Sequence, residues 1–157
     1  MNGDSRRRRS VYEKGVGIIR GRFVLVSRDR RFTRLFREAT LRLPQGVSPI
    51  KTVKLVSLSN RRTKTMVGLT KYSRVRFFFL SRPKQSITFY SSLMGALSEQ
   101  AATAVIAHEL AHAWLNEHVR PEESRRREGE ADLLAREWGF GAELDALNRE
   151  AETVNSP

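Results

Sequence analysis

Two different hydrophobic patterns divide the chain near residue 91. Before that point, β-branched and aromatic residues form short runs that turn residues interrupt, which is typical of strands. We expect strands within residues 17–27, 52–58, 65–70, 75–80 and 87–90. Residues 31–38 instead place Phe32, Leu35 and Phe36 at positions i, i+3 and i+4, which predicts one short amphipathic helix in this part of the chain.

After residue 91 the pattern becomes helical. Ser98 suits a helix N-cap, and the segment 99–117 that follows is rich in alanine and contains neither glycine nor proline. Pro121 ends that segment and suits the first turn of a second helix, over residues 122–137. The sequence Trp-Gly-Phe-Gly at 138–141 predicts a break, and residues 142–152 predict a last helix.

Length and composition limit the class of protein. A chain of 157 residues with 39% hydrophobic and 29% charged residues is typical of one globular domain. The strand pattern before residue 91 and the helical pattern after it indicate the α+β class. We expect a flexible basic segment at residues 1–14 and a single domain at 15–157. The chain contains no cysteine, which excludes a disulfide framework, thiolate metal ligands and a cysteine nucleophile. Only His, Asp and Glu remain as strong metal ligands.

Charge is distributed unevenly along the chain. Residues 1–97 contain 23 Lys and Arg and 4 Asp and Glu, a net charge of +19, whereas residues 98–157 contain 6 and 13, a net charge of −7. The strand-rich region 15–91 is therefore basic, and the helical region 92–157 is acidic. The basic part is expected either to attract nucleic acid or another acidic partner, or to pair with the acidic helices. We found no signal peptide or membrane span in the sequence, and expect a cytoplasmic protein.

A catalytic motif lies in the first long helix. Residues 108–112 read His-Glu-Leu-Ala-His, in which two histidines four residues apart lie on one helix face and can reach one metal ion. Glu109 projects beside that ion, where it can take a proton from a metal-activated water. The helix around the motif is apolar, and burying two histidines and a glutamate there is costly unless a partner binds them. The motif therefore predicts a zinc site.

Two residues could provide the third protein ligand. Glu128 lies in the sequence Glu-Gly-Glu-Ala-Asp at 128–132, where Asp132, four residues later, could accept the free ring N–H of a ligand histidine. The other is His118, which completes a three-histidine spacing if the chain turns out of the helix near Leu115. Leucine resists the left-handed conformation that such a turn requires, so we favour Glu128 and keep His118 as the alternative.

The two motifs together resemble the gluzincin zinc metallopeptidases, in which HExxH is followed by a downstream helix carrying ExxxD. Within that group, residues 75–138 are most similar to the HtpX-like peptidase domain and the soluble minigluzincins. The transmembrane helices of HtpX are missing here, and the spacer of 15 residues between His112 and Glu128 is short for the family.

This resemblance implies a zincin-like fold, with a mixed or antiparallel sheet packed on the active-site helix and a second helix bringing the third ligand. It also implies peptide-bond hydrolysis by one Zn²⁺ per chain. Its ligands would be His108, His112 and Glu128, with Glu109 as general base and Asp132 orienting a ligand histidine, which we expect to be His108. An edge strand would bind the substrate backbone, and the candidate residues are Phe77, Phe78, Phe79 and Leu80. The candidates for stabilising the oxyanion are His118, Tyr90 and Arg120.

Three other functions stay open at this point. A SprT-like protease acting on nucleic-acid-bound proteins would use the basic half, although that family takes a third histidine and only His118 is available here. A YbeY-like metal-dependent endoribonuclease would share the three-histidine spacing, but would leave the 128–132 motif unexplained. The third is a non-catalytic zinc-binding module with a zincin-like fold.

Overall fold

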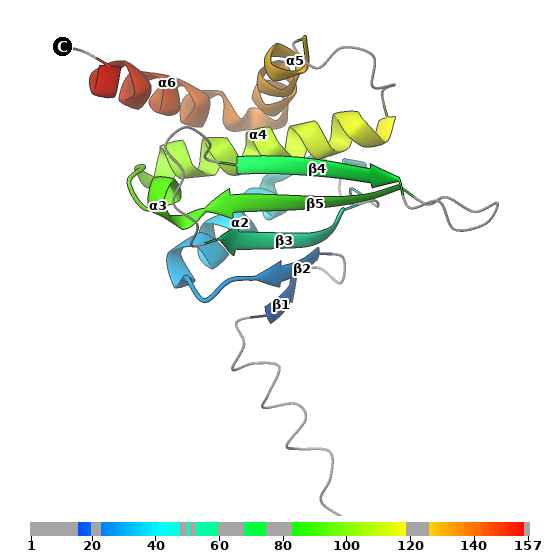
Figure 1. Cartoon of the computed structure of the whole chain (residues 1–157). Helices are drawn as coiled ribbons and strands as arrows, with labels where there is room; N and C mark the ends of the chain where they lie inside the picture. Colours follow the sequence, from blue (N-terminus) through cyan, green and yellow to red (C-terminus); the bar gives the residue numbers. More distant parts are fainter. Residues whose placement is uncertain are drawn as a thin grey trace, which may run out of the picture.

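The computed structural model describes residues 16–19, 23–47, 50, 53–59, 68–74, 83–118 and 126–155. The elements, in chain order, are β1 (Val16–Ile19), β2 (Phe23–Val26), α2 (Arg30–Arg42), β3 (Val53–Ser59), β4 (Gly68–Arg74), β5 (Pro83–Tyr90), α3 (Ser91–Met94), α4 (Glu99–His118), α5 (Arg126–Ala135), the π-helical turn η1 (Arg136–Phe140) and α6 (Gly141–Asn155) (Figure 1). The presence of both helices and strands, with the strands mostly before the long helices, confirms the predicted α+β class. Residues 1–14, expected to form a flexible segment, lie outside the described residues.

The described strands form one five-stranded mixed sheet in the order β1-β2-β3-β5-β4. The three central strands, β2, β3 and β5, are parallel, and the edge strands β1 and β4 each pair antiparallel with their neighbour. A mixed sheet is therefore correct, and the fully antiparallel alternative is wrong. The reason is the connection between β2 and β3, which runs through α2 and returns the chain in the same direction.

Strand positions agree with the sequence pattern in most places. The strand expected at 65–70 is described as β4, Gly68–Arg74, while β5 begins at Pro83, earlier than the expected residue 87. The strand expected at 75–80 lies outside the described residues. The edge of the described sheet next to β5 is formed by β4.

Helix α2 is longer than residues 31–38 because both of its ends are set by local signals. The side chain of Asp29 caps the first turn, where its Oδ1 accepts from the backbone N–H of Phe32 at 2.9 Å. At the other end the helix stops at Arg42, two residues before Pro44. Phe32, Leu35 and Phe36, the residues at the helical spacing expected from the sequence, are buried, and so is Ala39 in the extension of the helix.

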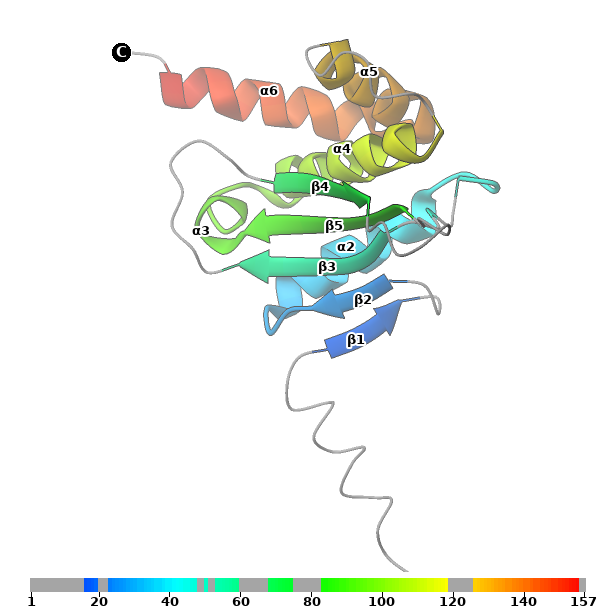
Figure 2. The same ribbon diagram turned by 45° about the vertical axis from the view of Figure 1, so that its right-hand side comes forward.

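Helix α4 is apolar on nearly all sides because it lies between two layers. Helices α2 and α4 pack on one face of the sheet, and α5 and α6 lie on the side of α4 that faces away from it (Figures 1 and 2). A helix enclosed in this way needs apolar residues around its whole circumference. The Oγ of Ser98 accepts from the backbone N–H of Ala101 at 3.1 Å, which caps the helix as expected.

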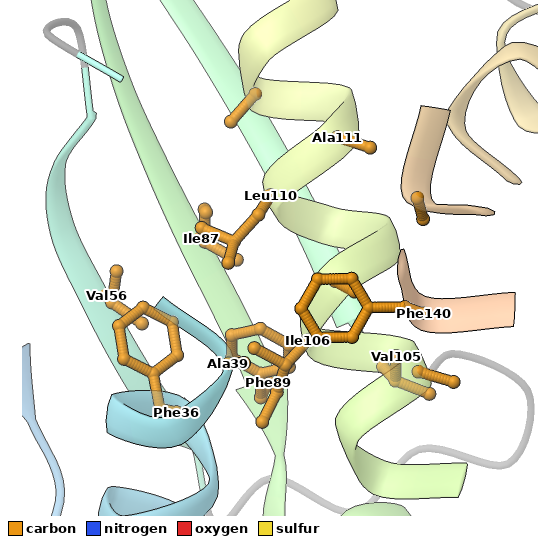
Figure 3. Packing of buried hydrophobic residues seen from close by; sticks show 14 of the residues in the cluster. Phe36, Ala39, Val56, Ile87, Phe89, Val105, Ile106, Leu110, Ala111 and Phe140 are labelled. Carbon is orange, nitrogen blue, oxygen red and sulfur yellow. The ribbon is translucent and has the colours of Figure 1, made fainter. Parts of the chain in front are cut away.

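The core joins α2, the central strands and α4. Phe89, on β5, is fully buried and packs against Phe32 and Phe36, with ring centroids 5.1 Å and 6.4 Å apart. Figure 3 shows Ile106 of α4 beside this aromatic group and Phe140 approaching α4 from the other side. Side chains of the sheet and α2 pack on one side of α4, and side chains of α5, η1 and α6 pack on the other. This packing fixes the position of α4 in the fold.

Helices α5 and α6 meet at a kink and not at a loop. The break expected at 138–141 is the π-helical turn η1, in which Gly139 has φ +88°. That value lies in the left-handed region, which glycine reaches without steric cost. Trp138 and Phe140, on either side, are buried, so the kink points both rings into the core.

Arginines of α2 account for part of the expected pairing between the two charged halves. Arg31 donates to the carbonyls of Met94 and Leu97, at 3.0 Å and 2.6 Å, and Arg34 pairs with Glu99 at the start of α4. Arg42 donates to the carbonyl of Gly139 and to Glu143, and lies over the ring of Phe140 with Cζ 4.2 Å from the centroid. These contacts dock the basic helix on the acidic region. Among the described residues, no helix is long and apolar enough to cross a bilayer.

Candidate metal centre

Helices α4 and α5 bring His108, His112 and Glu128 to one point. The two Nε2 atoms of the histidines lie 3.0 Å apart. Nε2 of His108 lies 3.2 Å from Oε2 of Glu128, and Nε2 of His112 lies 3.4 Å from Oε1 of the same carboxylate. Three ligand atoms of the kinds that zinc prefers therefore face one another.

The spacing of these atoms fits a zinc ion. Zinc binds His nitrogen and carboxylate oxygen at about 2.0–2.2 Å with tetrahedral geometry, which separates the ligand atoms by about 3.3 Å. The observed separations of 3.0, 3.2 and 3.4 Å surround that value. Among the described residues, the cluster has two histidines and one carboxylate, and three protein ligands with an open fourth position are typical of catalytic zinc sites.

Asp132 contacts the ring of His108. Its Oδ1 lies 2.8 Å from Nδ1 of His108, on the opposite side of the ring from the cluster. An ionised carboxylate can only accept, so this contact favours a proton on Nδ1, which is the tautomer whose Nε2 could bind a metal ion. Asp132 lies one turn after Glu128 on α5, so one helix face contributes both carboxylates.

The electrostatics of His112 favour a neutral ring. Burial lowers the pKa of His112, and repulsion from His108 in its protonated form lowers it further, against the opposing influence of Glu128. A neutral imidazole is the form that binds a metal ion. Glu109 is 7% exposed and lies about 60° around the α4 axis from His112, so it is buried beside the two histidines rather than between them.

His118 is not part of the cluster. It lies at the end of α4, where its Nδ1 is 2.9 Å from the carbonyl of Trp114 and its ring stacks on the indole at 4.2 Å. Ten residues after His108, it lies about 80° away from that residue around the helix, on the side opposite to His112. The three-histidine arrangement is therefore not brought together by the described residues.

Of the remaining candidate residues, the structure describes Tyr90 alone. Tyr90 ends β5 and is paired with Ser59 of β3. Arg120 and the four residues Phe77, Phe78, Phe79 and Leu80 lie outside the described residues.

Three polar residues next to the cluster were not singled out from the sequence. Nη1 of Arg127 donates to Asn116, and Nδ2 of Asn116 donates to Oε1 of Gln85 at 3.1 Å. Within the described part of the chain, Nη2 of Arg127 is buried and has no hydrogen-bond partner. Asn116 follows His112 by four residues, and this continuation of the histidine spacing is the signal that could have identified it.

The sequence model of the SprT-like family matches residues 32–128, which is 97 of the 157 residues. The chain belongs to the SprT-like family. SprT-like domains are metallopeptidase-like and typically bind zinc. The match therefore supports the broad prediction of a zinc-peptidase-like domain, and it does so through the SprT-like family, which the sequence left open as an alternative. This match carries nothing specific to the HtpX-like domain or the minigluzincins. No curated protein and no solved structure matches the chain.

Proposed function

We propose that this SprT-like protein is a zinc-dependent metallopeptidase with His108, His112 and Glu128 as its ligands. The observation that carries the proposal is the triangle of ligand atoms, 3.0–3.4 Å apart, on two helices. The sheet, the HExxH helix and the second ligand-bearing helix are also the layers that a zincin-like fold requires, and their order here supports that assignment.

The side chains around the cluster have separate roles in this mechanism. A zinc ion held there supplies a Lewis acid that lowers the pKa of water toward about 7. Glu109 accepts the proton of the attacking water and returns it to the leaving amine. Asp132 keeps the proton of His108 on Nδ1, so that Nε2 stays a metal ligand throughout. Burial lowers the pKa of His112 and so favours the neutral form that binds a metal ion.

In this proposal a carboxylate takes the place of the third histidine expected for SprT-like proteins. The chain has three histidines, and the described position of His118 is on another side of α4 from the cluster. Glu128 is the last residue of the family match. The proposed ligand set is therefore that of a gluzincin within a SprT-like chain.

We place the substrate backbone along β4. This strand forms the edge of the described sheet next to α4, and an edge strand has free N–H and C=O groups that an extended peptide can pair with (Figure 1). The earlier candidates, residues 77–80, follow β4 in the chain and lie outside the described residues.

Cleavage of an unfolded protein substrate tests the proposal. Glu109→Gln is expected to retain zinc and to lose cleavage of casein, because the amide cannot accept the proton. Glu130→Gln is the matched control, since Glu130 is an exposed glutamate on α5, and it should cleave like the wild type. Cleavage by Glu109→Gln at the wild-type rate, or zinc-loaded wild-type protein that cleaves no member of a broad peptide library, would contradict the proposal. The second result would favour a non-catalytic zinc-binding module.

A second proposal concerns a nucleic-acid partner for the basic half. Arg28, Arg30 and Arg37 are exposed, and their side chains form no ion pair with the described residues. Arg30 and Arg37 are seven residues apart and share the outer face of α2. We propose that this face contacts the phosphate backbone. Binding to DNA or RNA that weakens as salt increases would support this, and no binding at low salt would rule it out.

A further inference from the structure

We propose that Gln85, Asn116 and Arg127 form a positioning chain that holds Glu128 against the metal-binding histidines, an inference that rests on the proposed function. The chain of hydrogen bonds connects α5 to the sheet through α4. Arg127 donates to Oδ1 of Asn116, Asn116 donates to Oε1 of Gln85 at 3.1 Å, and Nε2 of Gln85 donates to the backbone carbonyl of Ala113 at 2.8 Å.

The direction of every bond in this chain is determined. A guanidinium can only donate, so Asn116 must present its oxygen to Arg127 and its NH₂ group to Gln85. Gln85 then accepts with its oxygen and donates with its nitrogen to the carbonyl of Ala113. Gln85 is 2% exposed and lies on the core-facing side of β5, with Ile87 and Phe89 at the alternating positions that follow. A buried amide is costly without hydrogen bonds, so these bonds hold it in one orientation.

The position of the chain relates it to the metal ligands. Asn116 follows His112 by one turn of α4, so His108, His112 and Asn116 share the face toward α5. On α5, Arg127 immediately precedes Glu128. The contact between Asn116 and Arg127 is therefore made one turn along the same helix interface that forms the metal cluster.

Glu128 has little packing of its own to hold it in place. Its side chain is 71% exposed, and a Cβ built on the neighbouring Gly129 would meet no atom within 4 Å. The first turn of α5 must therefore be fixed from elsewhere. The side chain of Arg127, tied through Asn116 and Gln85 to the sheet, supplies that anchor.

Zinc affinity in a double-mutant cycle tests the inference. Zinc is titrated against a chromophoric chelator for the wild type, Asn116→Ala, Glu128→Ala and the double variant. Asn116→Ala is expected to weaken zinc binding about tenfold, within the range for residues that orient a ligand. In the Glu128→Ala background the same change is expected to have no further effect, because the ligand that it positions is gone.

Two further variants and a spectrum separate positioning from a general structural role. Arg127→Ala breaks the same link from the other side, and remains informative if Asn116→Ala fails to fold. Arg127→Lys keeps a donor for Asn116 and removes the buried Nη2 atom, so wild-type affinity is expected. The d–d absorption of the cobalt(II) form should change in Asn116→Ala as it does in Glu128→Ala. Arg136→Ala, which removes a surface pair with Asp145 on η1 and α6, is the matched control and should leave affinity and spectrum unchanged.

The outcomes distinguish this inference from the proposed function. If Glu128→Ala weakens zinc binding but folded Asn116→Ala and Arg127→Ala bind like the wild type, the positioning chain is wrong and the ligand set stands. Equal weakening by Asn116→Ala in both backgrounds also overturns the inference, because the effect would not act through Glu128. If the wild type binds no zinc, or Glu128→Ala binds it as tightly as the wild type, both the ligand set and the positioning chain are wrong.

Discussion

Replacement of Asp132 by Asn is expected to weaken zinc binding about tenfold without unfolding the protein. The carboxylate lies 2.8 Å from Nδ1 of His108, and in the proposed mechanism it holds that ring in the tautomer that leaves Nε2 free for the metal. Residues in this role contribute about 10–100-fold to metal affinity. Because the Asp132 side chain is 54% exposed, water replaces part of its effect, so the lower end of that range, about 1.4 kcal/mol, applies. Asparagine keeps an oxygen acceptor and loses the charge, whereas Asp132→Ala loses both and should weaken binding more.

The assay is competition for zinc against a chromophoric chelator at neutral pH, with the melting temperature of the metal-free protein measured in parallel. Glu130→Gln removes the same charge from the same helix two residues away, and is expected to change the affinity less than about twofold because solvent and salt screen it. Equal losses in Asp132→Asn and Glu130→Gln would show that only the overall charge matters. Wild-type affinity in Asp132→Ala would show that the hydrogen bond to His108 does not support metal binding.

Three further predictions concern the fold that carries the site. Phe89→Ala should lower the free energy of unfolding, measured in urea, by about 3–5 kcal/mol, because a fully buried ring is lost. Leu133→Ala, at an exposed position, should lower it by under about 0.5 kcal/mol. Similar values for the two variants would contradict the described packing of Phe89. Burial opposes ionisation of Glu143, but its hydrogen bond and attraction to Arg42 prevail and lower its pKa. The ionised form of Glu143 therefore stabilises the protein, by under about 1 kcal/mol, at pH values above the ordinary pKa of glutamate, and this stability is lost as the pH falls through the lowered pKa. The free energy of unfolding of Glu143→Gln should be below that of the wild type at pH 7 and equal to it in acid, and a difference that does not change with pH would refute this. Gly139→Ala should lower the free energy of unfolding by about 1–2 kcal/mol, because alanine is strained at φ +88°. No steric clash adds to this loss, since no atom lies within 4 Å of the added Cβ. An unchanged melting temperature would exclude that backbone conformation.

The strongest signals in the sequence came from residues that lie close together on one helix, because helix geometry alone fixes their relative positions. His108 and His112 are four residues apart, so any α-helix places their rings on one face. The apolar residues of 99–117 likewise predicted a buried helix, and α4 is buried along most of its length. The sheet was harder to predict, because a run of β-branched residues favours a strand without specifying its partner. The parallel pairing of β2 with β3 depends on the path of α2.

The sequence by itself therefore determined the HExxH helix, the α+β class and the uneven charge, because each depends on residue types and on spacings of a few positions. Only the tertiary structure decided which distant side chain faces the histidines, since Glu128 and His118 are both compatible with the spacing. Packing of α5 against α4 places the Glu128 carboxylate 3.2 Å and 3.4 Å from the two Nε2 atoms, while continuation of α4 to His118 turns that ring away. The hydrogen bonds from Arg127 through Asn116 to Gln85 also arise only on folding, because they join residues on three elements.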